Sequence, residues 1–147
     1  MSNVRTEIVS CPNCSNKQEI EVWESINVTI DPALKEQLFN GTINSFKCSI
    51  CTYETRIETA LLYHDMTQEF AVQYYPYSFL KIKEFLEDQR NITHHFDELL
   101  KSEPKNIPRY LLKPHIVFSL EEMCRYVIYI EKVFKNHIGD FNELLRS

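Results

Sequence analysis

Two Cys-x-x-Cys pairs constrain the fold of this chain more than any other feature of its sequence. The first pair is Cys11-Pro12-Asn13-Cys14 and the second is Cys48-Ser49-Ile50-Cys51, with residues 15–47 between them. A two-residue spacer lets one tight turn present two thiolates to the same ion, and zinc prefers four soft ligands in a tetrahedron. The pairs therefore predict one Zn²⁺ held by Cys11, Cys14, Cys48 and Cys51, in a fold that brings two distant turns together.

A zinc ion with four thiolate ligands has no vacant coordination position, and such sites are structural rather than catalytic. The competing interpretation is thiol redox chemistry, in which a single Cys-x-x-Cys usually stands at the N-terminus of a helix. Here there are two pairs, and neither begins an apolar helical repeat. The fifth cysteine, Cys124, falls on an apolar helical stripe and is predicted to be a small core residue.

The charge balance limits the classes of partner. The formal net charge is −5, and lysines and arginines are spread along the chain. A protein that binds nucleic acid by neutralising phosphates needs a basic surface, so no nucleic-acid partner is expected. No apolar run approaches the roughly 20 residues of a membrane-spanning helix, and the N-terminal residues form no apolar signal core. We therefore expect a cytoplasmic protein without a membrane contact.

The first half of the chain has the pattern of a small β domain, residues 1–76. Alternating polar and apolar residues favour extended structure. Asp31 and Pro32 indicate the start of an inserted helix that ends at Asn40 and Gly41. The turn between the last two strands is expected at residues 64–67. The predicted strands are 5–9, 18–23, 44–48, 53–63 and 69–75.

The second half, residues 77–147, has helical periodicity. Short helices are predicted near 79–86 and 93–101, followed by a loop at 102–109. The clearest helix start is Ser119, where Glu122 completes a capping box before an apolar stripe. A similar pair, Asp140 and Glu143, predicts a short last helix. The fold class is therefore α+β: a zinc-ribbon-like antiparallel β domain with an inserted helix, followed by a C-terminal helical segment.

Several motifs, taken in order, resemble the bacterial CpXC domain. They are Cys11-Pro12-x-Cys14, residues 21–32, Ser45-Phe46-Lys47-Cys48 and Leu62-Tyr63-His64-Asp65-Met66. The resemblance covers roughly the first half, and the second half is similar to the helical tail that follows this domain in some relatives. It implies a zinc-ribbon-like fold and no particular activity.

The sequence departs from the usual zinc knuckle at the residue after each pair. Zinc knuckles usually place glycine there, because the backbone turns to positive φ, but this chain has Ser15 and Thr52. A β-branched residue at positive φ is strained. We therefore expect the second knuckle to turn differently from the first.

Three classes of function are weighed. His64 and Asp65 suggest an enzyme with a site between sheet and helices, but adjacent strand residues point to opposite faces, so a structural Asp in a turn is favoured. A nucleic-acid-binding zinc ribbon is the second alternative. The interpretation favoured over both is a structural zinc-binding protein that acts as a non-catalytic interaction or adaptor module, with a protein partner or as a homo-oligomer.

Overall fold

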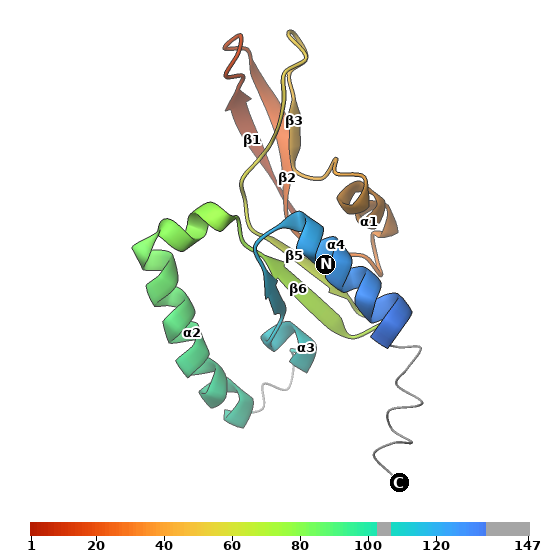
Figure 1. The fold of residues 1–147 in the computed structure, drawn as a ribbon, viewed down its shortest axis with the longest axis vertical. Helices are drawn as coiled ribbons and strands as arrows, with labels where there is room; N and C mark the ends of the chain where they lie inside the picture. Colours follow the sequence, from red (N-terminus) through yellow and green to blue (C-terminus); the bar gives the residue numbers. More distant parts are fainter. Residues whose placement is uncertain (103–106, 135–147) are drawn as a thin grey trace.

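A mixed five-stranded sheet forms the centre of the molecule (Figure 1). The computed structural model describes residues 1–102 and 107–134. The strand order is β1-β2-β5-β6-β7. The strands are β1 (Asn3–Ser10), β2 (Lys17–Asn27), β5 (Leu61–Asp65), β6 (Phe70–Tyr74) and β7 (His115–Val117).

The α+β class is confirmed, but the expectation of a purely antiparallel sheet is wrong. β1 pairs antiparallel with β2 and β5 with β6, whereas β2–β5 and β6–β7 are parallel. Parallel neighbours need a long crossover connection. The chain provides one between β2 and β5 and another between β6 and β7, and both connections contain helices.

The two cysteine pairs lie in the turns of two β-hairpins. β1 and β2 form the first hairpin, while β3 (Ser45–Lys47) and β4 (Glu54–Arg56) form a separate two-stranded sheet. Figure 1 shows the turns of both hairpins at the same end of the molecule, away from the helices. The predicted strand at 53–63 is divided: it leaves the small sheet after β4 and joins the large sheet as β5.

Helices α1 (Pro32–Phe39) and α4 (Leu120–Ile128) pack against the sheet and against each other. Helix α1 begins at Pro32 as predicted, and the chain leaves it through Gly41 at φ 78°. In α4 the Ser119 hydroxyl accepts the Glu122 N–H at 3.1 Å. The Glu122 carboxylate accepts the N–H of Phe118, one residue before the cap, also at 3.1 Å. A π-helical turn, η2 (Tyr129–Phe134), continues α4.

The buried side chains form two separate clusters. The larger one, which we call the main core, joins the sheet to α1 and α4. The smaller one, which we call the cysteine lobe, surrounds the tips of the two hairpins. The main core includes Ile26, Leu34, Leu38, Leu61, Tyr63, Val72, Met123 and Val127. The cysteine lobe contains Cys11, Phe46 and Cys48, with Val9, Ile20, Cys51 and Ile57 packed against them.

The part of the chain after Pro76 is less uniformly helical than the sequence predicts. It holds η1 (Tyr77–Lys81), α2 (Lys83–Ser102) and α3 (Arg109–Leu112), but also β7. Helix α2 is continuous where two short helices were expected. Its Phe85 ring contacts Tyr75 and Phe79 with centroids 4.8 and 5.5 Å apart. The domain boundary near Pro76 stays a prediction, and the last helix predicted at Asp140 lies outside the described residues.

Within residues 1–102 and 107–134, no helix combines the length and the apolar character needed to span a membrane.

Candidate metal centre

The two Cys-x-x-Cys turns have the same backbone hydrogen bonds. In the first, the Cys11 N–H donates to the Asn16 carbonyl at 2.8 Å and the Cys11 carbonyl accepts the Ser15 N–H at 2.9 Å. In the second, the Cys48 N–H donates to the Tyr53 carbonyl at 2.8 Å and the Cys48 carbonyl accepts the N–H of Thr52 at 3.2 Å. Each hairpin therefore ends in one tight knuckle that presents two sulfurs on the same side.

The expectation that the second knuckle turns differently is wrong. Ser15 and Thr52 both have φ 62°, the left-handed value that glycine adopts without strain. The paired hydrogen bonds on either side fix this turn, and they outweigh the preference of a β-branched residue for negative φ. Thr52 therefore holds a strained backbone in order to complete the second knuckle.

The four sulfurs of Cys11, Cys14, Cys48 and Cys51 lie within 4.8 Å of one another. The Cys11–Cys51 and Cys14–Cys48 sulfur pairs are each 3.5 Å apart. A disulfide would need about 2.05 Å. A tetrahedral ion with metal–sulfur bonds of about 2.3 Å separates its ligands by about 3.8 Å. The arrangement thus fits a metal ion with one ligand pair from each hairpin.

Local hydrogen bonds favour thiolates in the second knuckle. The backbone N–H groups of Cys51 and Ile50 lower the pKa of Cys48 to about 6. The Asn13 side chain and the Tyr53 N–H lower the pKa of Cys51. At Cys14 the Asn16 N–H also favours the thiolate, but desolvation and the neighbouring sulfurs raise its pKa to about 12. Because crowded thiolates repel one another, only a bound cation lets all four ionise together.

A glutamine of the first hairpin holds the second knuckle in place. The Gln18 side-chain amide donates to the Lys47 carbonyl at 2.8 Å, and its oxygen accepts the Ser49 N–H at 3.0 Å. These two backbone groups lie immediately before and after Cys48. Asn16 adds contacts from its amide to the Gln18 oxygen at 3.3 Å and to the Cys48 sulfur at 3.9 Å. Gln18 cannot be identified from the sequence as a residue of this site, because in an alternating strand it has the pattern of an ordinary polar residue.

His64 and Asp65 lie in β5 and are both buried, at 6% and 7% relative exposure. The Asp65 carboxylate accepts the Gln68 N–H at 2.9 Å and the Thr29 hydroxyl at 3.3 Å, so it closes the turn after β5. Burial lowers the pKa of His64, and its Nδ1 has no hydrogen-bond partner among the described residues. The structural role favoured for Asp65 is confirmed, although the predicted start of the turn at His64 is wrong because β5 runs through Asp65.

The remaining cysteine lies far from this cluster along the chain and in the fold. Cys124 is half-buried in α4 and packs against the main core. Its sulfur lies 4.0 Å from the carbonyl oxygen of Leu38 in α1. The prediction that Cys124 serves as a small core residue is confirmed.

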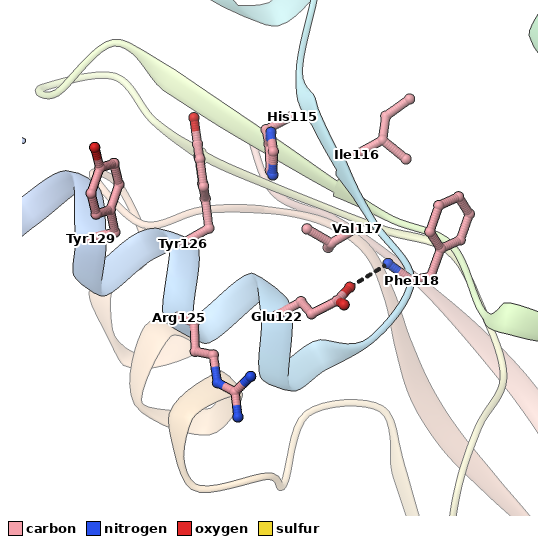
Figure 2. A pocket seen from close by; sticks show the side chains of 8 residues that line it. All are labelled: His115, Ile116, Val117, Phe118, Glu122, Arg125, Tyr126 and Tyr129. Carbon is pink, nitrogen blue, oxygen red and sulfur yellow. Dashed lines mark hydrogen bonds between the residues drawn. The ribbon is translucent and has the colours of Figure 1, made fainter.

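An open pocket of about 500 Å³ lies between β7 and α4 (Figure 2). His115 stacks on Tyr126 with ring centroids 4.0 Å apart and planes inclined by 8°. Figure 2 shows the Glu122 carboxylate turned toward the Phe118 N–H and Arg125 directed to the other side of the helix. His64 and Asp65 do not line this pocket. Its charged groups therefore do not converge on one point.

One of three comparisons with known proteins found a match. A family model described as CpXC protein matches residues 9–138, which is most of the chain and includes all four cysteines of the cluster. The comparison with curated proteins found no match, and neither did the comparison with solved structures.

Proposed function

This chain belongs to the CpXC protein family, and from that premise we propose that it is a zinc-dependent protein-interaction module. One Zn²⁺ on Cys11, Cys14, Cys48 and Cys51 holds the two hairpins together. The folded module contacts another protein and catalyses no reaction. The observation that carries the proposal is the gathering of four sulfurs from two matching knuckles within 4.8 Å.

The donor set supports zinc as the metal. Four sulfur ligands in a tetrahedron select zinc or iron over calcium, magnesium and manganese, which prefer oxygen. The paired backbone donors around Cys48 and Cys51 stabilise thiolates, which is the ligand form zinc requires.

The structural role follows from the number of ligands. Four cysteines complete a tetrahedral zinc, so no position remains for a water or a substrate. Interaction is supported by apolar side chains that remain exposed on regular elements. They are Val4 and Ile8 on β1 and Leu86 and Ile92 on α2.

Metal content tests the zinc part of the proposal. We expect one zinc per chain by elemental analysis of the full chain, purified without added metal. Cys48→Ser should lose that zinc, because three ligands and an open position bind it far less tightly. Cys124→Ser is the matched control and should retain one zinc per chain, because Cys124 packs on the main core.

Two results would reject the proposal as stated. One is a wild-type protein that is folded and metal-free, which would favour thiol redox chemistry as the role of the cysteines. The other is iron in place of zinc, which would be evident from its visible absorption as well as from the elemental analysis.

A further inference from the structure

Strand β1 forms one edge of the five-stranded sheet. It is eight residues long, and β2 is its only strand partner among the described elements. Exposed edge strands of this length are templates for pairing with another chain, unless a protein blocks them. The side chains of β1 therefore determine which partner its free edge accepts.

The free edge presents the backbone of alternate residues. In an antiparallel pair, residues that exchange hydrogen bonds alternate with residues that do not. Cys11 donates to Asn16 across the hairpin, and the register continues as Val9 with Gln18 and Glu7 with Ile20. By this alternation, Val4, Thr6 and Ile8 direct their N–H and C=O groups away from β2.

We propose that β1 pairs antiparallel with β1 of a second copy of this chain, around a two-fold axis at Thr6. In this register Val4 of one copy lies opposite Ile8 of the other, and Arg5 lies opposite Glu7. Val4 and Ile8 are 42% and 72% exposed in the single chain. The sequence around Thr6 is thus self-complementary, with apolar pairs on one face and opposite charges on the other.

The charges select this register over the next one. A two-fold axis at Glu7 would use the same outward-facing backbone groups. It would, however, place the Glu7 side chains of the two copies opposite each other and Arg5 opposite Val9. With the axis at Thr6, both charged pairs are of opposite sign. Cross-strand pairs of opposite charge stabilise a sheet, and like charges directly opposite destabilise it.

The charged side chains are already held on the correct face. The Arg5 guanidinium bonds to Glu7 at 2.8 Å and to Glu24 at 2.6 Å, and roughly a third of each Arg5 and Glu7 side chain is exposed, 38% and 37%. In the dimer each guanidinium would meet a second Glu7 carboxylate without leaving Glu24. Little side-chain ordering is then required on association.

This inference rests in part on the proposed function, because a bound zinc at the tip of the β1–β2 hairpin fixes the edge that the second copy meets. A contact through one strand is small compared with a standard interface. We therefore expect a reversible dimer that dissociates on dilution. Such a dimer would join two five-stranded sheets into one continuous sheet.

Charge variants of the full chain test the register. In the proposed dimer, residues 5 and 7 of the two copies give four charged side chains that face one another. Arg5→Glu makes all four carboxylates, and Glu7→Arg makes all four guanidinium groups. Each variant alone should dimerise at least about tenfold more weakly than wild type, because two attractions become two repulsions. Mixed in equal amounts, the two variants should form a heterodimer, since every charged pair is then opposite in sign.

The measurement is sedimentation velocity across a concentration series, with zinc content determined on the same samples. Glu21→Arg is the matched control: it alters charge as Glu7→Arg does, but on β2, opposite Thr6. It should leave dimerisation unchanged. A wild-type monomer at every concentration overturns the inference, and so does a dimer that neither variant weakens or that mixing fails to restore. Because zinc content is determined on the same samples, the two proposals fail separately: a zinc-loaded protein that stays monomeric rejects the strand pairing alone, and a metal-free protein that still dimerises through β1 rejects the proposed function alone.

Discussion

At the scale of single residues, Gln18 is the side chain that most directly links the two hairpins. Its amide bonds to the backbone on both sides of Cys48, so it holds one knuckle at a set distance from the other. Groups that orient metal ligands in this way commonly change metal affinity by 10- to 100-fold when removed, an order-of-magnitude range.

Gln18→Ala should therefore weaken zinc binding by about tenfold or more while leaving one zinc per chain at saturation. Competition with a chromogenic chelator measures the affinity. Gln73→Ala is the control, because the Gln73 amide donates to the Tyr74 carbonyl in β6, away from the cysteines. Equal affinities for Gln18→Ala and wild type would show that Gln18 does not position the ligands.

At Thr52 a substitution is expected to stabilise the protein, whereas Gln18→Ala is expected to weaken its metal site. A left-handed non-glycine residue costs about 1–2 kcal/mol, and glycine costs about 0.5–1 kcal/mol in the unfolded chain. Thr52→Gly should therefore stabilise the zinc-loaded protein by about 0.5–1 kcal/mol, seen as a higher Tm at fixed zinc concentration. Thr55→Gly, in β4, should lower the Tm, because its backbone is extended. A lower Tm for Thr52→Gly would mean that the threonine side chain stabilises the knuckle.

The residues that the sequence could predict at this site are the cysteines themselves. Their spacing carries the prediction, since two short spacers are enough to imply two knuckles. Gln18 and the strained Thr52 could not be identified in the same way. Gln18 acts through contacts with residues 47 and 49, and Thr52 adopts its φ because of hydrogen bonds that form only in the folded hairpin.

At the scale of elements, α4 shows that local sequence signals can be sufficient to predict where a helix begins. Ser119 and Glu122 predict the start of this helix, and the structure has the Ser119 cap. The Glu122 carboxylate accepts the Phe118 N–H rather than the Ser119 N–H of the predicted capping box. Removing a serine cap costs about 1 kcal/mol.

Ser119→Ala should accordingly lower the free energy of unfolding by about 1 kcal/mol, because the Glu122 N–H loses its acceptor. Denaturant unfolding at fixed zinc concentration measures the change. Ser10→Ala, at an exposed position of β1, serves as the control and should alter stability by much less. A loss no greater than that of the control would show that water replaces the cap at no cost.

Strand β7 shows where local signals fail. It has three residues, too few to establish an alternating pattern, and it follows a proline in a segment of helical character. Its extended form depends on β6, which it meets in parallel register from Val72 with His115 to Tyr74 with Val117. The mixed sheet could not be predicted for the same reason, because strand direction depends on crossovers whose path is set by the main core.

At the scale of the whole molecule, the two buried clusters are expected to differ in how much their stability depends on a bound metal. The cysteine lobe is small and has few apolar side chains besides the thiols. A metal ion on the four cysteines, as proposed, would therefore close a loop that little else holds. The main core joins β5 and β6 to α1 and α4 and contains no cysteine of the metal site.

Chelation of the metal should therefore remove the protection of backbone amides in two stages, and hydrogen exchange measures this loss. Amides of β3, β4 and both knuckles should lose protection first. Amides of α1, β5, β6 and α4 should lose it later and together, although α1 and β5 lie before Pro76 and α4 after it. Simultaneous loss in all elements would indicate one cooperative unit, and no loss in any would make the metal dispensable for folding.

The position of β7 in the chain also has a consequence for protein synthesis. All four cysteines have left the ribosome soon after residue 51, so the cysteine cluster can form while most of the main core is still missing. β6 then waits for residues 75–117 to be made, which takes on the order of seconds. Through that interval the β6 edge of the sheet is open to any extended segment nearby. A nascent chain of this protein is thus most exposed to wrong pairing between the emergence of Tyr74 and that of Val117.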